Sequence, residues 1–358
     1  MESDNMEKKP ITIKDIANLA DVSTGTVHRA LHGKKGVGEE MRARILQIAK
    51  ENGYVPNDVA AALKRKRQRV FVAAPGSRAS NRYFYSYVWK GFQDYFQQQR
   101  NFNIEVVYLP YYDVAGNNLV DELDAAFKHY NGEVDGVLVA GFLDERSIAW
   151  LRELIKKDIA VAIATDEVEG ALINVQADYF QTGALAAELL STQIPRGSKI
   201  LVAAGGMDIR AHYLMAHGFE EYLRSNDTGI ECIFVHGYGE DQNPQMQQRV
   251  EDLLDKTPEI RAMFSVNARG SVLLSEIVRK KGLAGKIRLV GNDLFDENTQ
   301  SMLDGVMQNI IFKSPYQQAC EAAKALFAYL LHSEKPIKQN VIIESNVIFL
   351  SNLKMYLH

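Results

Sequence analysis

The sequence is poor in cysteine and has no long apolar run. Its 358 residues contain two cysteines, Cys232 and Cys320, which are too few for a disulfide framework and indicate a reducing compartment. No apolar stretch approaches the roughly 20 residues that a membrane-spanning helix needs. The first ten residues, MESDNMEKKP, are polar and lack the apolar core of a signal peptide. We therefore expect a cytoplasmic protein without a membrane segment, with residues 1–10 as a disordered lead.

Sequence motifs of catalysis are also lacking. The chain contains no GxSxG, no HExxH, no phosphate-binding loop and no paired cluster of histidine and cysteine. A catalytic constellation needs such groups at fixed spacing. We therefore expect neither an enzyme nor a cofactor, and no metal site.

Charge is distributed unevenly along the chain. The formal net charge is -4, yet residues 1–69 carry 14 Lys and Arg against 9 Asp and Glu, a balance of +5. The remaining residues carry 27 against 36, a balance of -9. A basic head on an acidic body is typical of a module that meets nucleic-acid phosphates, joined to a body that does not bind them. The length suits a small module of this kind followed by a large ligand-binding region.

Residues 11–56 have the pattern of three short helices. Thr12 can cap the first helix, with Asp15 in its first turn, and Ser23 can cap the second. The second helix is expected over 24–31, and the third over 39–51, where Gly53 ends it. The predicted core is apolar at helical spacing and comprises Ile16, Ala17, Leu19, Ala20, Val27, Ala30, Leu31, Met41, Ile45, Ile48 and Ala49. The pattern predicts an all-α helix-turn-helix headpiece; the alternative is a small helical bundle with a solvated, charged face.

A basic segment over residues 57–69 joins this headpiece to the rest of the chain. Pro56 breaks the chain, Asn57 can cap one or two further helical turns, and residues 64–67 are Lys-Arg-Lys-Arg. The segment predicts a hinge helix, and the alternative is a flexible linker.

From residue 70 onward, apolar runs alternate with amphipathic helical patterns. Strands are expected over 70–75, 104–109, 135–140, 159–165, 199–203, 230–235, 262–266, 287–290 and 309–312, and the first helices over 83–99, 119–130 and 147–157. About ten strands that alternate with helices predict an α/β region of two doubly wound parallel lobes rather than one sheet. The expected N-lobe covers 70–174 and 313–338, and the expected C-lobe covers 175–312 and 339–358.

Side chains that follow the strands mark the expected ligand site, because ligands of such sheets bind beyond the carboxyl ends of the strands. The residues at those ends are Arg82, Tyr83, Phe84, Tyr85, Gly141, Phe142, Asp144, Asp166, Asp208, Arg210, Asn267, Arg269, Asn292, Asp293 and Lys313. Plainer alternatives stay open. Asp166 and Asp293 can be helix caps, Phe84 and Tyr85 can be core residues, and Arg269 can be a surface side chain.

The headpiece resembles the DNA-binding domain of the lac repressor family of bacterial regulators. The matching motifs follow in one order at one spacing: ITIKDIA at 11–17, Val22-Ser23, Thr26-Val27, Arg29, GYVPN at 53–57, Ala60 and Leu63. The resemblance implies that the second helix reads double-stranded DNA in the major groove. It also implies a homodimer on a near-palindromic operator, because two hinge helices enter the minor groove side by side.

DNA contacts are expected from the second helix and from the hinge. Arg29 is the candidate for a bidentate contact with guanine, because its fork matches O6 and N7. Leu63 is the candidate wedge that opens a base step in the minor groove. The remaining expected contacts are base or phosphate contacts from Thr24, Gly25, His28 and His32, phosphate clamps from Thr12, Ser23 and Thr26, and hinge contacts from Asn57, Ala60 and Lys64.

The body resembles the periplasmic sugar-binding-protein fold that follows the headpiece in this family. In relatives an aromatic pair before the first helix stacks on the sugar ring, and Phe84-Tyr85 occupy that place. The resemblance assigns further ligand contacts to Asp166, to Asn267 and Asp293, and to Arg210, which precedes Gly218-Phe219. The predicted ligand set is completed by Arg82, Phe142, Arg269 and Lys313.

One residue departs from the sugar-binding pattern. Many relatives have Gln before the proline of the third crossing between the lobes, whereas this chain has Lys313 before Ser314-Pro315. With Arg210, and with Arg82 or Arg269, it suggests an acidic or phosphorylated sugar held by charge-assisted hydrogen bonds. The alternative is a neutral sugar, with Lys313 paired to a nearby carboxylate.

The sequence as a whole predicts a transcriptional regulator, expected to act as a repressor, whose operator affinity depends on a sugar-like effector between two lobes. The alternatives are a cytoplasmic sugar-binding receptor and a sugar-acting enzyme without DNA control. The basic headpiece argues against the receptor, and the missing catalytic motifs argue against the enzyme.

Overall fold

A computed structural model describes residues 11–31, 35–52, 54, 67–99, 103–112, 118–237 and 243–357 of the chain. The chain forms two compact units, Met1–Arg65 and Lys66–His358. Several predictions lie outside the described residues, namely the contacts of His32, Asn57, Ala60, Leu63 and Lys64 and the helix stop at Gly53.

The described part of the first unit forms helices α1 (Ile13–Ala20), α2 (Thr24–Leu31) and α3 (Glu39–Glu51). These bounds confirm the helices that the sequence predicts. Their shared core comprises Ile16, Ala17, Ala20, Val27, Ala30, Ile45 and Ala49, with Leu31, Met41 and Ile48 partly buried against it. The prediction that Leu19 is buried is wrong, because this residue is 54% exposed. It lies about 100° around the helix from the centre of the buried stripe.

Side-chain caps fix the turn between the first two helices. The predicted capping box is present, since Thr12 Oγ1 accepts from the Asp15 N–H at 3.3 Å and Asp15 Oδ2 accepts from the Thr12 N–H at 2.9 Å. Asp21 then ends α1 in the left-handed region, with φ 55°. Ser23 Oγ accepts from the Thr26 N–H at 3.1 Å and so begins α2. The sequence therefore encodes this helix-turn-helix locally.

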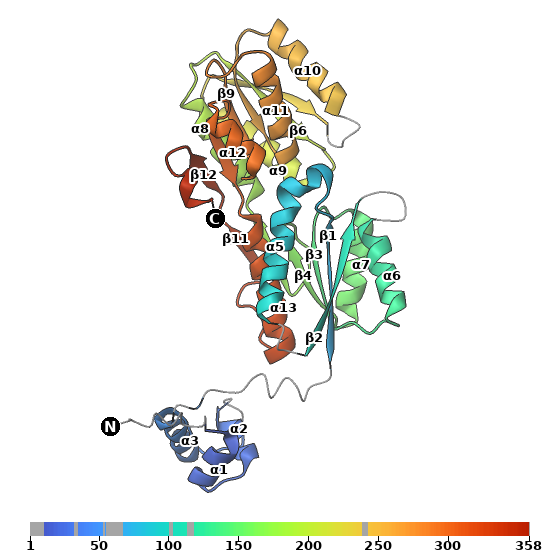
Figure 1. Cartoon of the computed structure of the whole chain (residues 1–358), viewed down its shortest axis with the longest axis vertical. Helices are drawn as coiled ribbons and strands as arrows, with labels where there is room; N and C mark the ends of the chain where they lie inside the picture. Colours follow the sequence, from blue (N-terminus) through green and yellow to red (C-terminus); the bar gives the residue numbers. More distant parts are fainter. Residues whose placement is uncertain are drawn as a thin grey trace, which may run out of the picture. The chain divides into compact units, whose positions relative to one another are not determined.

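The second unit contains an N-lobe whose sheet has the strand order β11-β5-β4-β3-β1-β2, all parallel (Figure 1). The strands are β1 (Gln68–Pro75), β2 (Ile104–Tyr111), β3 (Gly136–Ala140), β4 (Ala160–Ala164), β5 (Ile173–Ala177) and β11 (Asn340–Ile343). One face packs against α5 (Arg82–Gln98), which follows the short η1 (Ala79–Asn81), and against α13 (Pro315–His332). The other face packs against α6 (Leu119–His129) and α7 (Glu145–Lys156). Helices on both faces explain why the central strands are apolar throughout.

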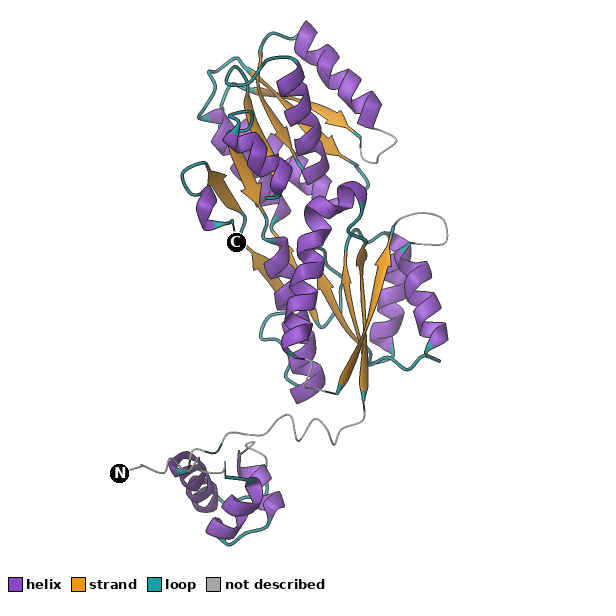
Figure 2. Ribbon diagram, in the orientation of Figure 1, coloured by secondary structure: helices purple, strands orange, loops and turns teal. Residues whose placement is uncertain are grey.

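The C-lobe repeats this three-layer arrangement of helices and strands (Figure 2). Its strand order is β12-β10-β9-β8-β6-β7. The strands are β6 (Lys199–Gly205), β7 (Glu231–His236), β8 (Ile260–Ser265), β9 (Arg288–Asn292), β10 (Asn309–Phe312) and β12 (Asn346–Phe349), which alone runs antiparallel to its neighbour. Helices α8 (Tyr179–Ser191) and α9 (Arg210–Ser225) cover one face. Helices α10 (Asn243–Lys256), α11 (Ala268–Lys280) and α12 (Asp296–Leu303), with η2 (Leu353–Met355), cover the other.

The two-lobed doubly wound fold is confirmed, but three strands were not predicted. These are β5, β11 and β12, which have five, four and four residues. Because β5 runs to Ala177 and β11 joins it in the N-lobe sheet, the lobe boundaries expected after residues 174 and 338 move to the far ends of these strands. The chain crosses between lobes after β5, after β10 and after β11.

The strand order reverses next to the first strand of each lobe. In the N-lobe β1 lies between β2 and β3, and in the C-lobe β6 lies between β7 and β8. Ligands of doubly wound sheets bind at such switch points, beyond the carboxyl ends of the strands. The fold therefore predicts that the loops after β1, β3, β6 and β8 form the ligand site. None of the helices in the described residues combines the length and the apolar character needed to cross a membrane.

Backbone contact between α8 and α9 sets the position of α9 beside these loops. A Cβ atom on Gly183 would lie 1.9 Å from the carbonyl oxygen of Met215, and one on Gly218 would lie 2.0 Å from that of Phe180. Only glycine therefore permits the two helices to approach this closely.

We predict that Gly183→Ala lowers the free energy of unfolding of the chain by about 1–3 kcal/mol, because the added methyl group forces the two helix backbones apart. Equilibrium urea unfolding of the full chain measures this change. Gln181→Ala, at an exposed position of the same helix, is the control and should change the value by less than about 0.5 kcal/mol. An unchanged midpoint for the glycine variant would contradict the close approach.

Candidate functional site

A pocket lies between the lobes, at the carboxyl ends of the strands of both sheets. Its lining comprises Asn81, Phe84, Tyr85, Phe142, Thr165, Tyr179, Ala211, His212, Met215, Val266, Asn267, Ala268, Arg269, Asp293 and Lys313. Seven of the residues predicted to bind ligand are among them: Phe84, Tyr85, Phe142, Asn267, Arg269, Asp293 and Lys313. Phe142 follows β3 and Asn267 follows β8, so the pocket includes the switch points of both lobes.

A buried ion pair between Lys313 and Asp293 forms part of the C-lobe wall. Lys313 Nζ lies 2.7 Å from Asp293 Oδ2, with side chains 5% and 3% exposed. The same ammonium donates to Asn292 Oδ1 and lies 5.6 Å from the centroid of the Phe84 ring. Burial lowers the pKa of Lys313, and the Asp293 carboxylate limits the fall. The charge of Lys313 is thus matched within the protein, as the neutral-sugar alternative requires.

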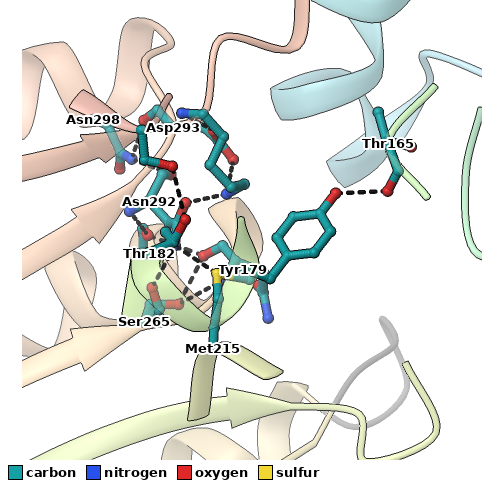
Figure 3. Close-up of polar contacts among 12 residues, drawn as sticks. Thr165, Tyr179, Thr182, Met215, Ser265, Asn292, Asp293 and Asn298 are labelled. Carbon is teal, nitrogen blue, oxygen red and sulfur yellow. Dashed lines mark hydrogen bonds and ion pairs between the residues drawn. The ribbon is translucent and has the colours of Figure 1, made fainter. Parts of the chain in front are cut away.

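Three residues around the pocket hold a backbone conformation that L-residues rarely adopt. Thr165, Asp293 and Ser314 have φ values of 70°, 64° and 53°, at the ends of β4, β9 and β10. Asn298 Nδ2 fixes one of these turns by donating to the carbonyl oxygens of Asn292 and Asp293 at 3.1 and 2.9 Å (Figure 3). Such strain costs roughly 1–3 kcal/mol per residue and is typical of functional sites.

Aromatic rings form the N-lobe wall. Phe84 and Tyr85 meet edge to face at 5.2 Å, and Tyr85 meets Phe142 in the same way at 6.4 Å. Tyr179, from the start of α8, donates its hydroxyl to the Thr165 carbonyl at 2.6 Å (Figure 3). The pocket therefore presents aromatic rings, Phe84, Tyr85 and Phe142 from the N-lobe and Tyr179 from the C-lobe, beside polar groups. This combination suits an amphipathic small molecule.

Three pocket residues of α9, Ala211, His212 and Met215, were not predicted from the sequence, and His212 and Met215 have the larger side chains. Burial, with the charges of Lys313 and Arg269, lowers the pKa of His212 to about 3, so the ring is neutral at pH 7. Its Nδ1 accepts from the Gly206 N–H at 3.3 Å, which leaves the proton on Nε2. All three residues lie within α9 rather than directly after a strand, so the strand-end rule did not include them.

Three predicted ligand residues do not line the pocket. Arg82 pairs with Glu297. Arg210 lies 2.6 Å from Glu167 and donates to Gln176 at 3.0 Å. Asp166 Oδ1 lies 3.5 Å from the same guanidinium. All three follow strands as predicted, but their side chains pair with one another or with residues that do not line the pocket. The family resemblance implied a ligand-binding arginine before Gly218-Phe219. Three residues before Gly218, the residue that lines the pocket is Met215 rather than an arginine.

Asp166 is nevertheless electrostatically unusual. Burial raises its pKa to about 6, although the N–H groups of Glu167 and Leu143 and the charge of Arg210 oppose the change. The carboxyl group is therefore more easily protonated in the folded chain than in the unfolded chain.

On the first unit, the predicted DNA-facing side chains of α2 share an exposed surface. Thr24, Gly25, His28 and Arg29 are exposed. Ser23 and Thr26 bond to each other through their hydroxyl oxygens at 2.9 Å, and Arg29 donates to Thr26 Oγ1 at 3.4 Å.

Arg42 of α3, which was not predicted as a functional residue, forms hydrogen bonds with the carboxyl end of α2. It donates to the carbonyl oxygens of Ala30 and Arg29 at 3.1 and 3.4 Å. The last carbonyl groups of α2 are thus satisfied by a cation.

The two units match two families of known proteins. Residues 12–57 match the bacterial regulatory proteins of the lacI family, and residues 72–334 match the periplasmic binding protein domain. The chain is 28% identical over 228 residues to the HTH-type transcriptional regulator pepR1 of Lactobacillus delbrueckii subsp. lactis, a match that spans 62% of this chain and 63% of that relative. It is 29% identical to catabolite control protein A of Streptococcus mutans over 67% of this chain and 69% of the relative. The match thus spans less than two thirds of the length of the first relative.

Solved structures share the fold. A LacI transcriptional regulator from Bacteroides fragilis superposes with a TM-score of 0.73 at 17% identity, over 82% of this chain and all of that chain. An ABC transporter solute binding protein from Burkholderia graminis, solved in complex with D-arabinose, superposes with a TM-score of 0.71 at 15% identity, over 82% of this chain and all of that chain. At such identities the likeness shows the fold alone.

The pKa of Asp166 predicts a pH dependence of stability. The value rises from 3.8 in the unfolded chain to about 6 in the folded chain, so the folded state binds the proton more tightly. The resulting stabilisation is present below pH 4 and is lost as the pH rises through about 6.

Asp166→Asn removes this titration. We expect the unfolding free energy of the variant minus that of the parent chain to rise by about 1–2 kcal/mol between pH 4.5 and pH 7.5, measured by urea unfolding across this range. Asp158→Asn, at an exposed position of the same lobe, is the control. A difference for Asp166→Asn that stays flat with pH would show that Asp166 titrates normally.

Proposed function

The chain belongs to the lacI family of bacterial regulatory proteins and carries a periplasmic binding protein domain, and from this premise we propose that it is a sequence-specific DNA-binding transcriptional regulator. A small polyhydroxylated effector in the pocket between the lobes sets its affinity for DNA. We likewise propose no enzymatic activity, since the matched families are regulators and binding proteins.

One observation carries this proposal: a single chain joins an exposed helix-turn-helix face to a pocket built by two lobes. A solute receptor needs a ligand pocket but does not need a helix-turn-helix headpiece. In the headpiece, the capped α2 presents its polar face to solvent, as insertion into a major groove requires. The basic balance of the first 69 residues agrees with a partner rich in phosphate.

The pocket suits a neutral sugar or cyclic polyol better than a phosphorylated one. Its aromatic wall can pack on the apolar faces of a sugar ring, and Asn267, Asp293 and the neutral His212 offer donors and acceptors for hydroxyl groups. The charge of Lys313 is balanced by Asp293, so Lys313 supplies no excess charge for a phosphate. The named ligands of structurally similar binding proteins, D-arabinose and myo-inositol, belong to this neutral class.

The regulator acts as a homodimer on a near-palindromic site in the cytoplasm, with one headpiece on each half-site. Arg29 is the proposed guanine-reading residue, because it is exposed on α2 and its guanidinium donates a hydrogen bond to Thr26 Oγ1. Binding of the effector couples to DNA through the lobes, a coupling that typically amounts to about 1–3 kcal/mol.

The effector class can be tested by a thermal-shift screen of the full chain against neutral sugars and polyols, sugar acids and sugar phosphates. We expect the neutral class to raise the melting temperature, because a ligand at 100 times its Kd stabilises the folded state by about 2.7 kcal/mol. A shift with sugar acids or phosphates alone would refute the neutral assignment. Absence of any shift would refute the sugar-like effector.

Asn267 supplies the matched variant for this test. Its Oδ1 accepts from the Gly270 N–H at 2.8 Å and caps α11, so Asn267→Asp keeps the cap but replaces the amide donor. We expect effector affinity to fall at least about tenfold, since a hydrogen bond to a charged or buried partner is worth about 1.5 kcal/mol or more. Asn118→Asp alters the equivalent cap of α6, outside the pocket, and should leave the affinity unchanged.

The DNA-binding role can be tested by selecting a site from a random duplex library and comparing two variants. Arg29→Ala should weaken binding to the selected site by about 1–3 kcal/mol and relax the preference at one base pair. Arg44→Ala, which removes an equal charge from an exposed position of α3, should affect all sequences alike. Equal loss of specific and non-specific binding in the Arg29 variant would contradict base reading by this residue.

A further inference from the structure

Contacts bridge the two lobes outside the pocket as well as inside it. On one rim, Arg82 and Tyr83 at the start of α5 meet Phe295 and Glu297 at the start of α12. On a second rim, Arg210 at the start of α9 meets Glu167 and Gln176 of the N-lobe. None of these seven residues lines the pocket.

The first of these rims, here called the α5–α12 rim, combines charge with ring stacking. Arg82 pairs with Glu297, and its guanidinium lies 4.3 Å from the centroid of the Tyr83 ring. The Tyr83 ring in turn stacks on Phe295, with centroids 4.6 Å apart and planes at 25°. Phe295 is 4% exposed, so the stack anchors the start of α5 to the buried base of α12.

The second rim, here called the α9 rim, is a hydrogen-bonded network. Arg210 reaches Glu167 at 2.6 Å and Gln176 at 3.0 Å. Gln176 Nε2 closes the network by donating to Glu167 Oε2 at 2.7 Å. Gln176 is 6% exposed, which gives the network a fixed base in β5.

We infer that the two rims form a clamp that holds the lobes closed whether or not an effector is bound. Contacts that line a pocket can be exchanged for contacts with a ligand, whereas these cannot, because the ligand does not reach them. Their attraction therefore adds to the stability of the closed state independently of occupancy. The effect of the clamp on effector affinity rests on the proposed function, whereas closure of the lobes does not depend on that function.

The consequence concerns the affinity of the pocket. A ligand that binds only the closed state has an apparent affinity reduced by the fraction of chains that are closed. A clamp keeps this fraction near one, so that little of the effector's binding free energy is used for closure. Weakening the clamp should therefore weaken effector binding without any change to a residue that lines the pocket.

Closure can be measured by pulsed electron spin resonance between spin labels on the two lobes of the full chain. Cys232→Ser and Cys320→Ser remove the native thiols, and Ala149→Cys on α7 and Arg249→Cys on α10 place labels at exposed positions. Without any ligand, we expect a distribution dominated by one narrow, short distance. A broad or mainly long distribution for the ligand-free parent chain would overturn the clamp.

Charge reversal tests the α5–α12 rim directly. Arg82→Glu and Glu297→Arg each place like charges together and should lengthen the distance, whereas the double variant should restore it. Arg152→Glu reverses a charge within the N-lobe on an arginine of similar exposure to Arg82, 50% against 48%, and is the control that should leave the distance unchanged. Single variants with the parent distance, or a double variant that stays open, would overturn the proposal.

The effector then provides a separate measurement. Each single reversal should weaken the binding of the sugar found in the thermal-shift screen, by less than about fivefold because the parent chain is mostly closed, with recovery in the double variant. Equal affinity across all variants would overturn the link between clamp and pocket. If no sugar binds at all, the proposed effector class fails, while the distance measurement still decides on the clamp.

Discussion

The buried ion pair between Lys313 and Asp293 is the interaction on which the rest of the site depends. Lys313 follows β10 at a crossing between lobes, and Asp293 follows β9. Both groups are nearly inaccessible to water, so each needs the other: removing one partner of a buried pair typically costs about 3–5 kcal/mol. The pair thus fixes two strained turns, at Asp293 and Ser314, and through the second turn it sets the start of α13 in the other lobe.

The ion pair also supports the ligand class that we propose for the pocket. A lone carboxylate at Asp293 would repel an anionic ligand, and a lone ammonium at Lys313 would attract one. Held at 2.7 Å, the two charges balance each other at this wall, against which hydroxyl groups can form hydrogen bonds. Arg269 is the other charged residue of the lining. The departure at Lys313 that suggested an acidic effector is therefore compensated by a residue twenty positions earlier in the chain.

Much of the fold could be predicted because its signals are local. The headpiece helices follow from Thr12, Ser23 and a periodic core, and most strands follow from apolar runs bounded by turns. The short strands β11 and β12 could not be predicted, since four residues carry little signal and their pairing depends on distant partners. In the site, three residues that the strand-end rule selects, Phe142, Asn267 and Asp293, line the pocket. It also selected Arg82, Asp166 and Arg210, because position in sequence does not encode the direction of a side chain at a rim.

A clamp of this kind limits how an effector can act. Exposed ion pairs contribute about 0–1 kcal/mol each and an aromatic stack about 0.5–1.5 kcal/mol, so the open state is a minor population but not a negligible one. An effector that favours the closed state can convert only this minor population, and its influence on DNA is correspondingly small. A large response requires a ligand that favours the open state, or one that changes the geometry of the closed state. The rims therefore keep the pocket formed before the effector binds. They also limit how far an effector can change the affinity for DNA.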